Sequence, residues 1–274
     1  MFGVPQRKRG RIQSAFEIFE LIYHSIIHEQ RKDSRHAVLG LIGNMLQTMI
    51  LVASFYFMFM VLGLRGNAVR GDFLLYVMSG IFMFICHTKS VAAVAGAPGP
   101  TSAMMNHAPM NTVVAVASTA LSALYTQVLS AFVVLFLYHA IITPITINEP
   151  VAALGMLILA WFSGCAVGTV LLALKPWFPG FVAIATQIYS RANMIASGKM
   201  FLANTLPGYM LAMFDWNPLF HIIDQCRGFV FLHYNPHFSN IEYPVIVSLV
   251  LLMIGIIGES YTRKHASVSW SAGK

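Results

Sequence analysis

Long apolar stretches without charge dominate the chain and alternate with short polar connections. Ala37 to Leu64 and Ser90 to Asn148 contain no Asp, Glu, Lys or Arg. A helix of about 20 apolar residues crosses a hydrocarbon core about 30 Å thick. The pattern therefore predicts membrane-spanning helices.

Helix signals and breaks divide these stretches into six predicted spans of an all-α integral membrane fold. Asp72 and Asn111 are placed as N-caps, and Pro150 suits the first turn of a helix. The Pro- and Gly-rich stretches 96–100 and 175–180 cannot continue a helix. The predicted spans lie at about 38–64, 73–95, 112–138, 151–174, 181–200 and 243–261.

A polar, basic segment over 1–37 precedes the first span. Ser14 and Glu17 have the spacing of a capping box at a helix start. The predicted helix is amphipathic, with Glu20 and His24 on its polar stripe, and such a helix lies in the membrane interface. The chain thus divides into an interfacial segment, a six-helix domain and a tail, at 1–37, 38–262 and 263–274.

The composition excludes an ordinary soluble domain. Hydrophobic residues make up 57% of the chain and charged residues 10%, against about 25% charged in soluble domains. The net charge of +7 does not indicate a nucleic-acid partner, because the basic residues flank apolar spans. With the N-terminus inside, twelve basic residues lie on the inner side and four on the outer side. This bias predicts that both termini are cytoplasmic.

Sequence signatures of catalytic and metal sites are lacking. Gly198-Lys199 has neither the upstream Gly nor the following hydroxyl of a phosphate-binding loop, so we expect no ATP site in this chain. His24 and His28 are four apart, as are His233 and His237, but neither pair has a third ligand beside it, and we expect no metal. We interpret the three cysteines as small core residues.

A Gly164-x-x-x-Gly168 motif in the fourth predicted span allows close helix approach. We expect it to serve packing within the chain. Contact between two copies of the chain is the alternative.

The segment 201–242 carries charged residues in an otherwise apolar stretch. Asp215, Asp224 and Arg227 cannot face lipid at low cost, which predicts a re-entrant helical segment packed on protein. Asn217 is the expected cap of a short helix, with Pro218 at its first position. Asp224 and Arg227 would then share a face and form a pair.

The same region resembles a known family. Ser197-Gly198 and Leu206-Pro207 are followed by the run Asn217-Pro-Leu-Phe-His221, an acid, an Arg and several aromatic residues. The rest of this pattern consists of Asp224, Arg227, Phe229, Phe231, His233, Tyr234 and Tyr243. The order is similar to that of type-2 ABC exporter permeases, in particular inner-membrane proteins of capsule polysaccharide export, with O-antigen and teichoic-acid permeases as more distant relatives. The resemblance covers nearly the whole chain and is strongest over about 197–262.

The resemblance implies a homodimer in the bacterial inner membrane that exports a lipid-linked polysaccharide. Two separate ATPase subunits would bind ATP and Mg, and this chain would be neither an enzyme nor a cofactor carrier. Periplasmic and outer-membrane export proteins would be further partners. The expected ATPase contacts are the interfacial helix and the loop between the second and third spans, with residues Glu20, His24, Thr101, Ser102, Asn106 and His107.

The fifth predicted span is unusually polar and carries the predicted substrate path. Its polar residues are Gln187, Tyr189, Arg191, Asn193 and Lys199. A cation at membrane depth costs at least about 2.5 kcal/mol unless it faces protein or water. We therefore predict that the two cations attract an anionic polymer in a water-filled path and that Tyr189 stacks on sugar rings. The alternative is that Lys199 extends to the outer headgroups and that Arg191 bonds to backbone carbonyls of a neighbouring helix.

Three other functions remain open. The chain could be a type-2 ABC permease for a lipid or a drug. It could also be a membrane-embedded enzyme acting on lipids or sugars, for which Asp215, His221 and Asp224 form the single acid–histidine cluster. A channel or a secondary transporter is disfavoured, since the spans lack carboxylates for coupling ions.

Overall fold

The computed structural model describes residues 20, 22–26, 37–61, 63, 72–99 and 111–265, and within these ranges all regular structure is helical. The predicted all-α class is therefore confirmed. The elements are α2 (Ala37–Val61), α3 (Phe73–Gly96), α4 (Thr112–Ile141), α5 (Pro150–Leu174), α6 (Pro179–Ala196), the short 3-10 helix η2 (Ala203–Thr205), α7 (Gly208–Phe214), α8 (Pro218–Val230) and α9 (Glu242–His265).

Five of the described helices are long and apolar enough to cross a membrane, judged by length and composition. They are α2 from Leu39 onward, α3, α4, α5 and α9. The predicted fifth span corresponds to α6, which has 18 residues and does not reach the apolar content of the others. The described part of the chain thus has five such helices where the sequence predicted six.

The predicted helix starts are confirmed by their hydrogen bonds. The side chain of Asp72 accepts from the backbone N–H of Leu74 at 2.9 Å, and Asn111 accepts from Val113 at 3.4 Å. Pro150 occupies the first turn of α5. These residues satisfy N–H groups that have no partner inside the helix, which is why the local sequence locates the boundaries well.

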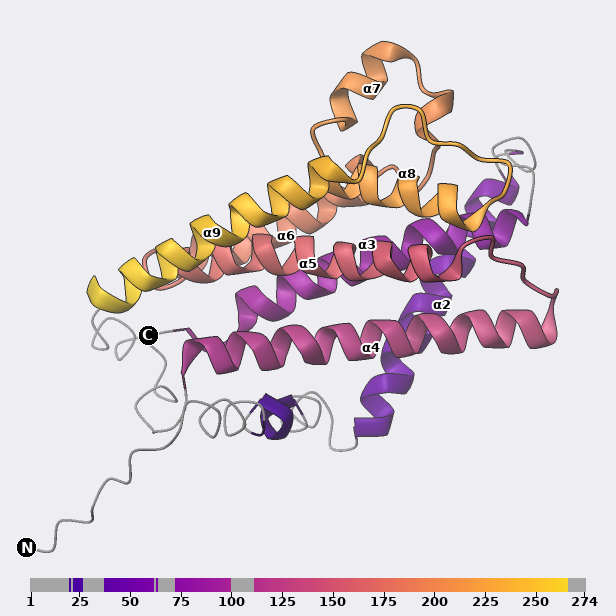
Figure 1. Ribbon diagram of the computed structural model, residues 1–274. Coiled ribbons are helices and arrows are strands. Elements are labelled where there is room, and N and C mark those ends of the chain that lie inside the picture. Colours follow the sequence, from indigo (N-terminus) through magenta and orange to yellow (C-terminus); the bar gives the residue numbers. More distant parts are fainter. Residues whose placement is uncertain are drawn as a thin grey trace, which may run out of the picture.

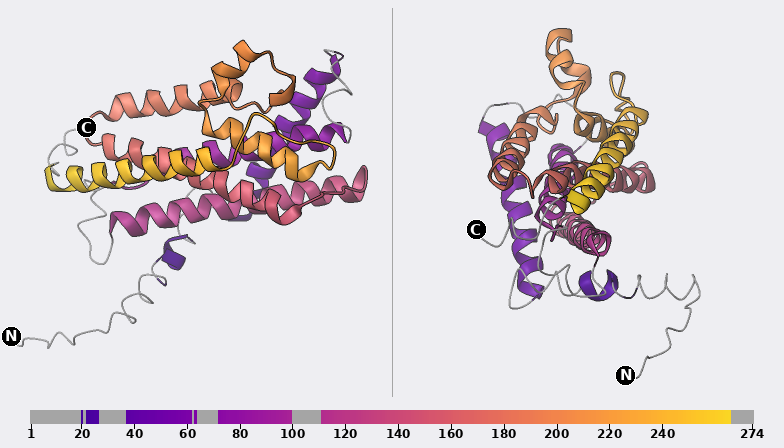
Figure 2. Two further views of the ribbon diagram at one scale, coloured as in Figure 1. Left: turned by 45° about the horizontal axis from the view of Figure 1, so that its top comes forward. Right: turned by 90° about the vertical axis from the view of Figure 1, so that its left-hand side faces the viewer.

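Helix α3 forms the centre of the bundle (Figures 1 and 2). Most of its residues are buried, with α4, α5, α8 and α9 arranged around the α3–α5 pair. Helix α2 crosses the other long helices at a steep angle. Because of this crossing, α2 contacts α3 and α4 over a short stretch of its length.

Polar contacts define the two ends of the bundle. At one end, here called the Lys175 end, Lys175 donates to the carbonyl of Ala95 at 3.1 Å and Thr262 donates to that of Ala173 at 3.0 Å. At the opposite end, here called the Asp72 end, the N–H of Asn148 donates to the carbonyl of Val230 at 3.2 Å. Helices α3 and α5 therefore run between the two ends, and the last turn of α9 lies at the Lys175 end.

The glycines of the G-x-x-x-G motif bring α5 against α3. A Cβ added to Gly164 would lie 2.4 Å from the carbonyl oxygen of His87, and one added to Gly168 would lie 2.7 Å from the Cβ of Val94. Any larger residue would push the helices apart. The predicted packing role within the chain is confirmed.

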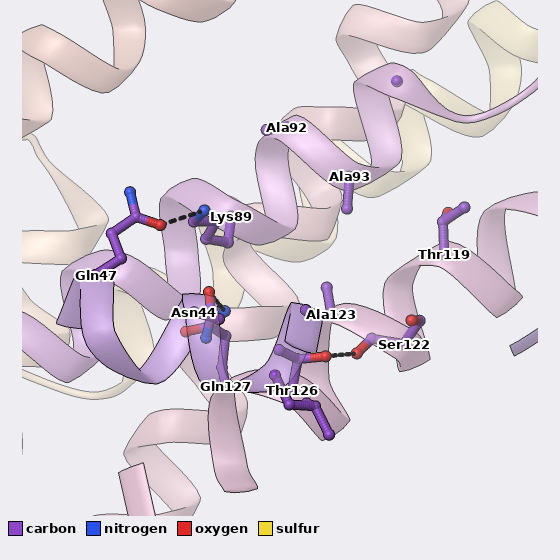
Figure 3. A pocket seen from close by; sticks show the side chains of 13 residues that line it. Asn44, Gln47, Lys89, Ala92, Ala93, Thr119, Ser122, Ala123, Thr126 and Gln127 are labelled. Atoms are coloured by element: carbon purple, nitrogen blue, oxygen red, sulfur yellow. Dashed lines mark hydrogen bonds between the residues drawn. The ribbon is translucent and has the colours of Figure 1, made fainter. Parts of the chain in front are cut away.

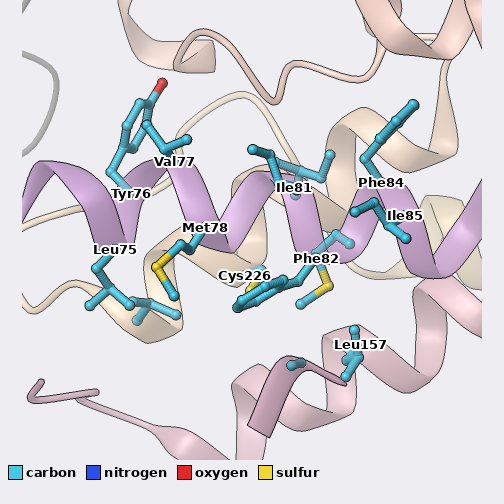
Figure 4. Close-up of a cluster of buried hydrophobic side chains, with 14 of the residues drawn as sticks. Leu75, Tyr76, Val77, Met78, Ile81, Phe82, Phe84, Ile85, Leu157 and Cys226 are labelled. Atoms are coloured by element: carbon cyan, nitrogen blue, oxygen red, sulfur yellow. The ribbon is translucent and has the colours of Figure 1, made fainter. Parts of the chain in front are cut away.

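The apolar core lies between α3, α5 and α8 (Figure 4). Phe82 and Cys226 lie next to each other on the side of α3 that faces Leu157. Cys86 and Cys165 are also buried, and all three cysteines are free thiols. Their interpretation as small core residues is confirmed.

The segment between α6 and α9 leaves the helix bundle and returns to it near the same point. The start of α8 meets the end of α6, because the side chain of Asn217 donates to the carbonyl of Ala196 at 3.0 Å. The start of α9 meets the same region through a 2.7 Å bond from the Tyr243 hydroxyl to the carbonyl of Trp216. Helix α8 packs on α3 and α5, so its many polar residues face protein.

Several predicted features lie outside the described residues. They are the capping box Ser14 and Glu17, the loop residues Thr101, Ser102, Asn106 and His107, and the end of the tail at 266–274.

Candidate functional site

Two grooves lie on either side of α2 where it crosses α3. The first, called the α4 groove, has a volume of about 480 Å³ and lies between α2, α3 and α4. The second, called the α6 groove, has a volume of about 700 Å³ and lies between α2, α3 and α6. They share Gln47, Lys89 and Ala92, so the two grooves meet at one wall.

The α4 groove is rich in amides and hydroxyls (Figure 3). Gly96, the last residue of α3, also lines it, which places the groove toward the Lys175 end. Its polar lining residues are Asn44, Gln47, Lys89, Thr119, Ser122, Thr126 and Gln127.

Polar bonds hold α2 to its neighbours along this groove. The ammonium of Lys89 donates to the Gln47 side-chain oxygen at 2.9 Å. The Asn44 amide donates to the hydroxyl of Ser130 at 2.9 Å and accepts from Gln127 at 3.3 Å. An ammonium has three donors, so Lys89 keeps capacity for an acceptor inside either groove.

The charge along both grooves is of one sign. Among the described residues that line them, Lys89 and Arg191 carry charge and no Asp or Glu is present. Lys89 is half-buried and Arg191 is exposed. The two grooves therefore form a positively charged surface whose other polar groups are neutral.

The predicted path residues of α6 separate into two groups. Arg191 lines the α6 groove, and Gln187 is exposed on the same side of the helix. Tyr189 and Asn193 point inward. The Tyr189 hydroxyl lies 2.8 Å from Nε2 of the buried His87.

Asn193 connects α6 to the start of α8. Its side-chain oxygen accepts from Asn217 at 2.9 Å, and its amide donates to the carbonyl of Tyr189 at 3.1 Å. Tyr189 and Asn193 therefore hold α6 on the bundle and do not face a groove.

Lys199 also lies away from both grooves. Its side chain is 2% exposed, and its ammonium lies 3.6 Å from the ring centre of Phe84 and 4.7 Å from that of Phe55. Its ammonium has no hydrogen-bond partner among the residues that the structure describes. Two aromatic faces thus provide the electrostatic compensation for this cation, and it does not extend to a polar surface.

Arg227 of α8 holds the turn that follows α6. Its guanidinium donates to the carbonyls of Gly198 at 2.9 Å, Phe201 at 2.7 Å and Lys199 at 2.6 Å. It also lies over the ring of Tyr76, 4.3 Å from the ring centre. The planar fork of Arg suits several fixed acceptors at once.

Asp224 binds a different part of the chain. Its carboxylate accepts from the hydroxyls of Tyr234 at 2.5 Å and Ser239 at 2.7 Å. No ion pair within 4 Å joins it to Arg227, so the predicted pairing of these two residues is wrong. The carbonyls of the turn at 198–201 accept from the guanidinium. The carboxylate accepts from hydroxyls of the loop after α8 and from the N–H of Ala203 at 3.4 Å.

The cap and the histidine of α8 are used in packing. Asn217 accepts from the N–H of Leu219 at 3.0 Å, with Pro218 in the first turn, as predicted. His221 accepts from the N–H of Asn240 at 3.2 Å through Nδ1. Its Nε2 then carries the proton and donates to the carbonyl of Asp215 at 2.7 Å.

Of the acid–histidine cluster Asp215, His221 and Asp224, the structure brings His221 Nε2 to 3.2 Å from an Asp215 carboxylate oxygen. In the described ranges, no three His, Cys, Asp or Glu residues come together as metal ligands. Both nitrogens of His221 are already engaged in hydrogen bonds. These bonds connect His221 to the residue before Trp216 and to the loop that leads to α9.

The expected ATPase-contact residues are described in part. Glu20 and His24 are both exposed, and His24 Nε2 lies 3.9 Å from a Glu20 carboxylate oxygen. The loop residues expected beside them lie outside the described ranges.

Sequence reasoning missed Lys89 as a groove residue, although it lies within the predicted span 73–95. It was counted with the inner loops. The available signal was a cation inside an apolar run. Asn44 and Gln127, which also line the α4 groove, gave no signal of this role in the sequence.

Comparison with family models and with curated proteins finds no match for the chain. The charge and the position of the two grooves therefore carry the functional argument.

Proposed function

We propose that the chain is the permease subunit of an ATP-driven exporter of an anionic, capsule-type polysaccharide carried on a lipid. The observation that supports this function best is the pair of grooves that meet at Lys89. They contain the cations Lys89 and Arg191, and no carboxylate lines them among the described residues.

Polar grooves between membrane helices need water or protein to cover them. In hydrocarbon, each unsatisfied polar group costs several kcal/mol, and a cation costs at least about 2.5 kcal/mol. The amides and hydroxyls of the α4 groove would therefore be unfavourable against lipid tails. A second copy of the chain would cover the grooves, and an anionic polymer would interact favourably with the two cations.

Helix α6 is a membrane span in this proposal, the fifth in chain order, and it brings the number of spans to six. Its 18 residues extend about 27 Å at about 1.5 Å per residue, close to the thickness of a hydrocarbon core. Ile184 and Ile188 are exposed on the same stripe as Gln187 and Arg191. This mixed stripe is suited to a protein partner or to water, and it explains why α6 is less apolar than the other helices.

The predicted re-entrant segment, 201–242, belongs in this proposal to the stretch between the end of α6 and the start of α9. It starts and ends near one end of the bundle, and α8 lies against α3 and α5. In the predicted orientation, this end faces the outside of the bacterial inner membrane. Two ATPase subunits, which hold ATP and Mg, would then bind at the opposite, Lys175 end.

Neutralising the groove cations should impair export. We expect that Lys89→Gln and Arg191→Gln each lower surface polysaccharide about tenfold, because a hydrogen bond to a charged group contributes about 1.5–3 kcal/mol. Lys89→Arg and Arg191→Lys should restore most of it. The measurement is surface polysaccharide at matched levels of the permease in cells that contain the complete exporter.

Lys264→Gln is the matched control, since Lys264 is exposed in the last turn of α9. It should export normally. Normal export by both groove variants, with normal protein levels, would contradict the proposal. Stimulation of the partner ATPase by a lipid or a drug, but not by the polysaccharide, would instead favour a type-2 permease for another substrate.

A further inference from the structure

A polar cavity of about 370 Å³ lies at the Asp72 end of the bundle. It is formed by the start of α3, the connection between α4 and α5, and the turn that follows α8. Its polar lining residues are Asp72, Thr146, Asn148 and His233, with Phe231 as a buried aromatic wall.

An apolar crevice of about 120 Å³ continues from this cavity between the helices. It runs between α4 and α5 toward the middle of the bundle, and α3 and α8 form its floor. Phe82, Leu157 and Cys226, which belong to the core, also line the crevice (Figure 4). Ala131, Leu135 and Ala153 line its two sides.

The cavity and the crevice are parts of one amphipathic site. Leu75, Ile147 and Val230 line both of them. The polar part lies where the helices end, and the apolar part lies between helices that are long enough to cross a membrane. A phospholipid has the same division, with a polar headgroup at the surface and a hydrocarbon chain below it.

The charge of the cavity selects among headgroups. Of the described residues that line it, Asp72 is the acid, and none is Lys or Arg. The Asp72 carboxylate accepts from the N–H of Leu74, from the Tyr138 hydroxyl and from Thr143 at 3.1 Å. The N–H of Leu75 is a further donor. The carboxylate is still partly exposed, so an ammonium in the cavity can share one of its acceptor positions.

Asp72 stays ionised at neutral pH. Burial alone would raise its pKa, but the hydrogen bonds from Tyr138, Leu74, Thr143 and Leu75 together hold the pKa below its ordinary value. An ionised carboxylate disfavours an anionic headgroup and favours an ammonium that can donate a hydrogen bond.

We propose that this site binds a phospholipid with a primary ammonium headgroup, phosphatidylethanolamine. The ammonium bonds to Asp72 in the cavity, and the first few methylene groups of one acyl chain occupy the crevice between α4 and α5. The site is separate from the grooves beside α2, so it does not depend on the proposed export function. A lipid bound there joins α4 to the α3–α5 pair and stabilises the folded chain by mass action.

Lipid selectivity tests the headgroup. The full chain, purified in detergent, is titrated with phosphatidylethanolamine, phosphatidylcholine or phosphatidylglycerol, and bound lipid is counted by native mass spectrometry. Phosphatidylcholine carries the same charge but has no N–H donor. We expect phosphatidylethanolamine to bind at least about tenfold more tightly than either of the others and to raise Tm.

Asp72→Asn tests the carboxylate without removing the helix cap, because Asn is an equally good N-cap. We expect this variant to lose the preference for phosphatidylethanolamine over phosphatidylcholine. If the variant keeps the preference, the headgroup does not bind at Asp72 and the proposal is wrong.

Ala153→Phe tests the crevice by filling it from α5. We expect at least a tenfold loss of binding for all three lipids. Ala140→Phe, at an exposed position of α4, is the control and should bind like the unaltered chain. Ala153→Leu replaces Ala153→Phe if the larger residue prevents folding. Equal binding of the three lipids to the unaltered chain, or full binding to the filled variant, would contradict the proposal. The lipid would then bind at the protein surface and not in this site.

Discussion

At the scale of single residues, the charges inside this protein are stabilised by three different physical means. Arg227 bonds to three carbonyls of one turn. Lys199 lies against two aromatic faces, and Asp224 accepts from two hydroxyls. None of these charges needs an ion-pair partner, which explains how the segment around α8 can be charged and still be buried.

Arg227→Lys should destabilise the protein although the charge is kept. A lysine cannot reach three carbonyls in a fixed plane, and each buried acceptor left without a partner costs about 1–3 kcal/mol. We expect at least about 2 kcal/mol of lost stability, measured as a lower Tm of the purified protein in detergent. Arg263→Lys, at an exposed position of α9, should leave Tm unchanged. An equal Tm for the two variants would show that the carbonyl bonds contribute little.

At the scale of helices, the bundle combines one tight pair with several looser attachments. Helices α3 and α5 are in close contact through Gly164 and Gly168. Helix α6 instead has two buried residues, Val182 and Asn193, and is attached by the polar contacts of Tyr189 and Asn193. The difference follows from side-chain size, since small residues allow backbone contact and larger ones hold helices apart.

Gly164→Leu should disrupt the α3–α5 pair, whereas Gly155→Leu in the same helix should not. A Cβ at Gly164 would clash with backbone atoms of α3, and one at Gly155 would meet nothing within 4 Å. Overpacking costs about 1–3 kcal/mol or more. Replacing a glycine inside a helix where there is room stabilises the helix by about 0.5–1 kcal/mol. Size-exclusion yield and Tm should therefore fall for Gly164→Leu alone. A matching loss for both variants would point to a general intolerance of leucine in α5.

At the scale of the whole molecule, the position of α6 decides how many times the chain crosses the membrane. Its first residues follow the Lys175 end, and its last residues meet α8 near the start of α9. Positive charge gathers at the Lys175 end in Lys175, Arg263 and Lys264. The positive-inside rule therefore predicts that this end faces the cytoplasm.

Labelling with a membrane-impermeant thiol reagent tests this topology. Phe178→Cys and Tyr209→Cys are at exposed positions on either side of α6, and the three native thiols are buried. We expect Tyr209→Cys to react in intact cells and Phe178→Cys to react after permeabilisation. Reporter fusions near Asn240 and at Lys274 should likewise report opposite sides. Reaction of both cysteines from one side would mean that α6 does not cross.

Local chemistry in the sequence was sufficient for the long helices and for several helix starts. Asp72, Asn111 and Asn217 accept from N–H groups two residues further on, and such bonds depend on neighbouring residues alone. The spacing of Gly164 and Gly168 was also informative, because residues four apart share a helix face. These features need no knowledge of which helices meet.

The grooves and the lipid site, in contrast, were decided by tertiary structure. Lys89 becomes a groove residue because α2 crosses α3 steeply beside it. Lys199 is buried because the turn after α6 passes over α3, where Gly80 leaves room: an added Cβ there would lie 3.0 Å from the Lys199 backbone. Asp72 lines a cavity together with residues of the α4–α5 connection and of the turn after α8. Sequence spacing specifies which residues share a helix, but the crossing angles and the close approaches between helices decide which residues share a site.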